Sequence, residues 1–131
     1  MIRSLVAASV IFISALSSAS AAPQIKVTGV FSDLHFVAQA GDVTGTEIFI
    51  VFGGEQGYFA IIQCAEGWPS KPVIVPAIVH GAEVEFAPHG QTESHCPNAK
   101  FRGTVSSSGL RGKFENTDYP GFLKRKRSYW Q

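Results

Sequence analysis

The chain has 131 residues, of which 11 are Lys or Arg, 10 are Asp or Glu, and 45% are hydrophobic. This composition excludes an intrinsically disordered protein, and the length suits one domain with a moderate core. The nearly balanced charge gives no general attraction to nucleic acid, so we expect no nucleic-acid partner.

The first residues predict export. Arg3 supplies a positive start, residues 5–16 form an apolar run, and residues 17–22 are small. Ala19-Ser20-Ala21 fits the small-x-small pattern that signal peptidase cleaves, so we expect a signal peptide over residues 1–21. The apolar run is too short for a membrane span. The expected product is a single soluble domain over residues 22–131, periplasmic or secreted.

The rest of the chain predicts β-structure almost throughout. Short runs rich in Val, Ile, Phe and Tyr alternate with Gly-containing turns, and no segment has helical periodicity. Residues 41–45 are expected to form a turn and residues 88–98 a polar loop carrying Cys96. The expected strands cover residues 25–31, 34–37, 47–52, 58–64, 73–79, 83–86, 100–105, 110–114 and 122–129.

This pattern predicts an all-β antiparallel meander of about eight strands. We favour a closed barrel, because closure removes exposed strand edges, over the alternative of a two-sheet sandwich. In pattern, although not in sequence motifs, the chain resembles lipocalin-type and avidin-type barrels. Strands this short do not suit a membrane barrel.

Charge is divided along the chain. Residues 22–99 contain two basic and eight acidic residues, whereas residues 100–131 contain eight basic and two acidic residues. Either the basic end neutralises the acidic body, or it forms a basic patch that attracts an acidic partner.

Cys64 and Cys96 are the two cysteines. In the oxidising compartment expected for an exported chain, they predict one disulfide.

Three neighbouring runs, residues 47–52, 58–62 and 73–79, are apolar at both alternating positions. Antiparallel strands with one solvated face should instead alternate. Either another sheet within the fold covers their outer side, or an outer apolar patch binds another protein or a second copy of the chain.

Catalytic motifs do not occur, and we expect no enzyme. Glu83 and Glu85 share one strand face, which we expect to be solvated. Asp33 and His35 also share a face and suit a hydrogen-bonded pair. His80, His89, His95 and Cys96 would suit zinc or copper only with a free thiol, so we expect no metal and no other cofactor.

The leading hypothesis is therefore an exported, non-enzymatic barrel that binds another protein, as an inhibitor, an immunity-type factor or an envelope accessory factor. The expected partner-binding residues are Trp68, Ile50, Phe52, Phe59 and Ile61. The alternative is a carrier that holds a small apolar ligand inside the barrel, lined by Phe31, Phe49, Tyr58, Ile62, Val75 and Phe86. A filled interior with an exposed apolar patch favours the first hypothesis, and an open interior favours the second.

Overall fold

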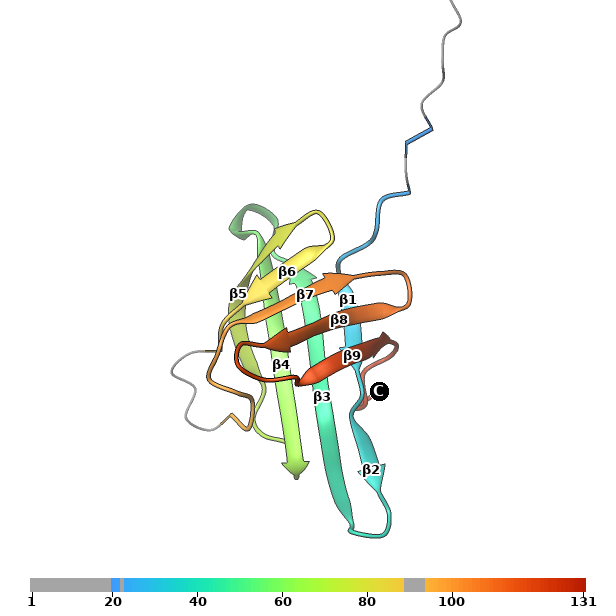
Figure 1. Ribbon diagram of the computed structural model, residues 1–131, viewed down its shortest axis with the longest axis vertical. Coiled ribbons are helices and arrows are strands. Elements are labelled where there is room, and N and C mark those ends of the chain that lie inside the picture. Colours follow the sequence, from blue (N-terminus) through green and yellow to red (C-terminus); the bar gives the residue numbers. More distant parts are fainter. Residues whose placement is uncertain (1–19, 22, 89–93) are drawn as a thin grey trace, which may run out of the picture.

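The computed structural model describes residues 20–21, 23–88 and 94–131 (Figure 1). Most of the predicted signal peptide, and His89, lie outside the described residues. The described chain forms β1 (Gly29–Ser32), β2 (His35–Val37), β3 (Asp42–Phe52), a short 3-10 helix η1 (Gly54–Gln56), β4 (Tyr58–Gly67), β5 (Val73–His80), β6 (Glu83–Phe86), β7 (Phe101–Val105), β8 (Gly109–Phe114) and β9 (Pro120–Arg125).

The strands form one closed antiparallel barrel. From β3 to β9 each strand pairs with the next along the chain, and β1 closes the circle by pairing with both β9 and β3. Eight strands make the barrel, and β2 is an extra strand on β3. Figure 1 shows β7, β8 and β9 crossing in front of β3 and β4, which extend with β2 beyond the barrel at its lower end. The predicted all-β barrel is confirmed, and the two-sheet alternative is wrong.

The expected turn over residues 41–45 is wrong, because β3 already begins at Asp42. Gly45 lies within that strand with a φ of +114°, and a Cβ there would lie 2.6 Å from the carbonyl oxygen of Asp33. The glycine therefore permits the close approach of the β1–β2 connection to β3.

Aromatic side chains fill the barrel interior. Phe31, Phe101 and Phe114 are fully buried, and Phe86 is 3% exposed. The Phe86 and Phe101 rings stack with centroids 4.7 Å apart, and Phe114 meets Phe101 edge-on at 5.4 Å. Gly112 makes room for this packing, because a Cβ there would lie 2.5 Å from the Phe101 ring. Each buried ring stabilises the fold by roughly 1.5–3 kcal/mol.

The core extends toward both ends of the barrel. At the upper end, buried Val27 joins the core, and Tyr58 and Val79 pack against it. At the lower end lies the predicted disulfide between Cys64 and Cys96, which is confirmed. The disulfide ties β4 to the loop before β7, and Cys96 follows Cys64 by 32 residues in the sequence.

We expect the Cys64→Ala/Cys96→Ala variant to lose roughly 3–4 kcal/mol of unfolding free energy, because the cross-link closes a long loop in the unfolded chain. Urea unfolding with and without reductant measures this. Reductant should lower the midpoint of the wild-type protein and leave that of the variant unchanged. Equal midpoints for the oxidised wild type and the variant would contradict the structural role.

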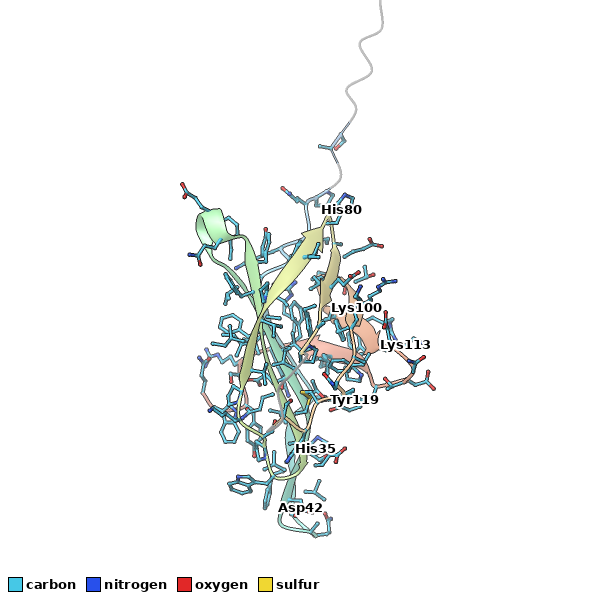
Figure 2. All side chains as sticks on the ribbon, turned by 90° about the vertical axis from the view of Figure 1, so that its left-hand side faces the viewer. His35, Asp42, His80, Lys100, Lys113 and Tyr119 are labelled. Atoms are coloured by element: carbon cyan, nitrogen blue, oxygen red, sulfur yellow. A yellow bond between two sulfur atoms is a disulfide. The ribbon has the colours of Figure 1, made fainter. Side chains whose placement is uncertain are left out.

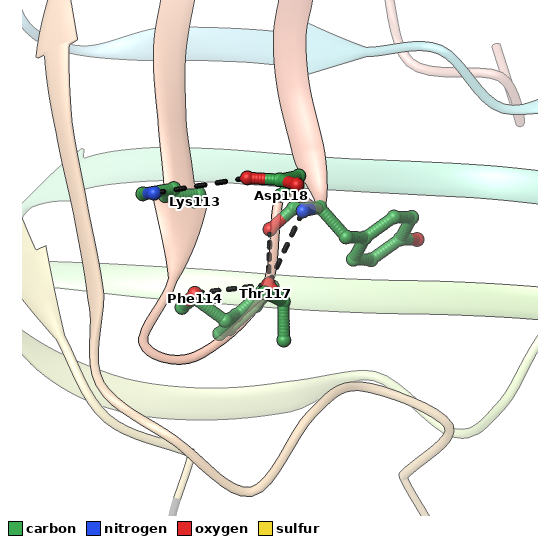
Figure 3. A network of polar contacts seen from close by, with 5 residues as sticks. Lys113, Phe114, Thr117 and Asp118 are labelled. Carbon is green, nitrogen blue, oxygen red and sulfur yellow. Dashed lines mark hydrogen bonds and ion pairs between the residues drawn. The ribbon is translucent and has the colours of Figure 1, made fainter.

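Tyr119 reaches the lower end from the turn between β8 and β9. Thr117 shapes that turn: its hydroxyl donates to the carbonyl oxygen of Phe114 (2.9 Å) and accepts from the backbone N–H of Tyr119 (3.2 Å) (Figure 3). The Tyr119 hydroxyl then hydrogen-bonds the buried Thr46 hydroxyl and the carbonyl oxygen of Gly45. Burial raises the pKa of the Tyr119 phenol above its ordinary value.

Since its pKa is raised on folding, Tyr119 stabilises the protein fully below about pH 10, and this contribution falls as the pH rises further. We expect Tyr119→Phe to cost about 1 kcal/mol at neutral pH through the lost hydrogen bonds. The gap between wild type and variant should narrow above pH 10. Urea unfolding below and above pH 10 measures this difference in unfolding free energy. Tyr58 and Tyr129 occur in both proteins, so their effects cancel in the comparison. A gap independent of pH would contradict the burial of a protonated phenol.

Candidate docking surface

The outer side of β3, β4 and β5 is apolar over its upper half. Alternation along each strand places one set of residues in the core, such as Ile48, Ile62 and Val75, and the other set outside. The outward residues lie in two rows across the three strands, and Ile78 continues the surface on β5. We call this surface the apolar face; it comprises Phe49, Ile61 and Ile74 in one row, Val51, Phe59 and Pro76 in the other, and Ile78.

Three of these side chains are widely open to solvent. Ile74 is 65% exposed, Ile78 is 68% exposed and Phe49 is 39% exposed, whereas Phe59 and Ile61 are half-buried. No charged residue occupies an outward position within the two rows. A surface of this kind exposes apolar area to water with no compensating interaction inside the chain.

The structure corrects two predicted roles on β3. Ile50, expected to bind a partner, is fully buried in the core. Phe49, expected to line the interior, instead points outward, opposite Ile61. Residues 47–52 are apolar at nearly every position, so their sequence does not show which side chains point into the barrel and which point outward. The prediction therefore placed Phe49 inside and Ile50 outside, the reverse of the structure.

A second sheet does not cover the outer side of these strands within the described residues; the C-terminal tail, residues 126–131, covers its lower part instead. The Glu47 carboxylate, 8% exposed, accepts hydrogen bonds from the Ser128 hydroxyl and the Tyr129 backbone N–H. Tyr129 packs on the small cluster of Leu34, Val43 and Ala65. The predicted strand over residues 122–129 therefore ends at Arg125, and the remainder crosses the sheet.

Trp130 ends this tail at the border of the apolar face. Its Nε1 donates to Oε1 of Gln63 at 2.7 Å, and Gln63 in turn donates to the carbonyl oxygen of Ser70. Gln63 follows Ile61 by two residues on β4, so both face outward on the same side. The indole is 56% exposed although its N–H is held.

Replacing Glu47 by Ala should release the tail, because its carboxylate binds two donors and each bond to a charged group contributes about 1.5–3 kcal/mol. We expect trypsin to cut after Lys126 and Arg127 roughly tenfold faster or more. Mass spectrometry of the timed digest follows the cut. Glu85→Ala, which removes a carboxylate far from the tail, should digest at the wild-type rate. Equal rates for Glu47→Ala and wild type would show that Glu47 does not hold the tail.

The remaining predicted partner-binding residues do not gather on one surface. Trp68 is 71% exposed, but it follows the lower end of β4, about 20 Å along the strand from Ile61. Phe52 is 62% exposed at the upper end of β3, where its ring meets that of Tyr58 at 5.0 Å. Only Phe59 and Ile61 belong to the apolar face.

Of the predicted interior residues, all except Phe49 join the barrel core. Phe31, Ile62, Val75 and Phe86 are buried within one cluster, and Tyr58 packs against it. These side chains touch one another across the interior as ordinary core residues do.

Asp33 with His35, and Glu83 with Glu85, were the polar pairs considered in the sequence, and their contacts differ from those expected. The Asp33 carboxylate accepts the Thr46 backbone N–H (2.6 Å), while His35 donates to the backbone carbonyl of Asp33 rather than to its carboxylate. Glu85 binds Lys100 and Arg102, and the hydrogen bond from Lys100 is the main reason why its pKa is lowered. Figure 2 shows His80 near the upper end of the barrel and His35 well below it, toward the lower end.

Sequence reasoning missed Ile74, Ile78 and Trp130 as candidate binding residues. The run of apolar residues over 73–79 carried a signal for the first two, since it lacks polar alternation. No local pattern indicates Trp130, whose position depends on Gln63 in a distant strand.

No family model matches this chain, and neither curated proteins nor solved structures gave a match. Among the described residues, no helix has the length and apolar character that crossing a membrane requires. In the same part of the chain, His, Cys, Asp and Glu side chains do not gather in threes as a metal site would need. The disulfide is compatible with an exported protein.

Proposed function

We propose that this protein is an exported, non-enzymatic barrel that binds another polypeptide through its apolar face. The observation that carries the proposal is the exposure of Phe49, Ile74 and Ile78 on the outer side of β3 and β5. Soluble proteins seldom leave large neighbouring apolar side chains in water without a use for them.

The size of the apolar face supports a protein partner. At roughly 200 Å² for a fully exposed side chain of this size, Phe49, Ile74 and Ile78 together present roughly 350 Å². That area lies within the range of functional patches and could form the core of an interface that buries about 800 Å² on each side. Trp130 at the border supplies an anchor of the type that dominates binding energy.

The alternative, a carrier of a small apolar ligand, has less support. Apart from Phe49, which points outward, its predicted lining residues pack together in or against the core, with Phe31 and Ile62 fully buried. A ligand inside the barrel would have to displace these side chains, at a cost of several kcal/mol of packing energy.

Photo-crosslinking from single positions tests the proposal. The full chain, produced in its own host, carries benzoylphenylalanine in place of Ile74, or of Asp42 as an exposed control at the lower end of β3. We expect Ile74 to crosslink to a defined polypeptide, either another protein or a second copy, and Asp42 to give no such product.

The Ile74→Ser/Ile78→Ser variant completes the design, because these exposed positions can be changed with little loss of stability. Crosslinking from Phe49 should fall at least about tenfold in this background, as one interface loses two buried anchors. The absence of any product from Ile74, or equal products from Ile74 and Asp42, would overturn the proposal.

A further inference from the structure

The outward positions of β7, β8 and β9 carry cations. Arg102 lies on β7, Arg111 and Lys113 on β8, and Lys124 on β9, and their strands contain no Asp or Glu. The alternate residues of these strands, among them Phe101, Leu110 and Leu123, are buried, so the four cations share the outer side. We call Arg102, Arg111, Lys113 and Lys124 the basic face.

The basic face is only partly neutralised by the protein itself. Arg102 lies directly opposite Lys113 in the β7–β8 register, and like charges facing each other across a sheet are destabilising. Glu85 shares its carboxylate between Lys100 and Arg102, and Asp118 reaches Lys113 only at 3.8 Å from a fully exposed position. Arg111 lies over the ring of Phe122, with 5.0 Å between guanidinium and centroid, instead of meeting a carboxylate.

The cations of residues 100–131 differ in what they contact. Arg125, from the same end of the chain, binds the backbone carbonyls of Lys26, Thr28 and Ser106 and serves the fold. Arg111 and Lys124 are exposed and do not serve the fold in this way. Their position next to other cations costs stability, which is consistent with a surface kept for an acidic partner.

The spacing of the cations suits a linear acidic chain. Arg111 and Lys113 are alternate residues of β8, about 7 Å apart. Lys124 pairs with Gly109 and so lies diagonally from Arg111, at about 7–8 Å. Carboxylates on alternate residues of an extended polypeptide recur at about 6.5–7 Å, so they can meet these cations in turn.

Neighbouring features favour a polypeptide over other anions. A groove of about 530 Å³, lined by Arg102, Thr104 and Arg111 and also by Ile78, adjoins the basic face and has room for side chains of a segment. Glu83 and Glu85 line the same groove from β6 and restrict acidic groups to its β7–β8 side. The Phe122 ring, covered by Arg111, does not offer the free surface on which nucleic-acid bases stack.

We infer that the basic face binds an acidic polypeptide segment in extended conformation. The centres of the two faces lie on opposite sides of the barrel, because β8 and β4 are four strands apart in either direction around it, and the faces meet at Ile78, which also lines the groove. This inference does not rest on the function proposed above.

Poly-L-glutamate is the probe, and its binding to the full chain is measured by fluorescence anisotropy at low ionic strength. We expect binding that is lost at about 0.5 M salt, since exposed charges are then screened. Arg111→Gln/Lys124→Gln should weaken it about five- to tenfold. Lys26→Gln/Lys71→Gln, with the same change of net charge away from the basic face, should bind as wild type does. Ile74→Ser, on the apolar face and outside the groove, should also bind as wild type does, which separates the two surfaces.

Three results would overturn the inference. The first is no binding of poly-L-glutamate at low ionic strength by wild type that is folded by circular dichroism. The second is an equal loss in the two charge variants, which would show a general effect of net charge. The third is tighter binding to vesicles of anionic lipid, with the same dependence on Arg111 and Lys124, which would assign the surface to a membrane.

Discussion

The barrel depends on β1, a four-residue strand that pairs with β9 on one edge and β3 on the other. Arg125 secures this junction. Its guanidinium binds three backbone carbonyls on both sides of the junction and packs over the buried ring of Phe31 at 4.8 Å. Hydrogen bonds from a charged donor to carbonyls that would otherwise need water are among the stronger polar contacts in a protein. Closure at this point removes the free edges of the sheet.

Closure also decides where binding can occur. Every strand in a closed barrel has one side inside and one outside, and in this chain the inside is filled by Phe31, Phe86, Phe101 and Phe114. With Val27 and Tyr119 near the two ends, the interior is packed as a core. We therefore propose that another molecule binds to the outer surface, which has an apolar side on β3–β5 and a basic side on β7–β9.

Much of the fold was predictable because it follows from composition and alternation. The disulfide was predicted from two cysteines in a chain expected to be exported, and the barrel from many short strands without helices. The side assignment of Phe49 and Ile50 was not predictable, because both are apolar and only pairing with β4 distinguishes them. Gly45 was misassigned to a turn, because a glycine that permits a close approach looks the same in sequence as one that permits a turn.

The candidate surfaces were less predictable than the fold. The basic end was visible as a charge bias, but its division between Arg125, which serves closure, and Arg111 with Lys124, which face water, depends on strand register. The first part of the tail was predicted to belong to the last strand, residues 122–129. Its actual course follows Glu47, whose buried carboxylate accepts hydrogen bonds from Ser128 and Tyr129 of the tail. Long-range polar contacts of this kind have no local sequence signal.

The central claim is that the outer surface of this barrel, and not its interior, binds another molecule. A native mass spectrum of the protein recovered from its own source tests this most directly. The account predicts a complex with a second polypeptide, of its own or another sequence, that is lost in Ile74→Ser/Ile78→Ser. A constant small extra mass on a single chain, retained in that variant, would contradict the account and place the ligand inside the barrel.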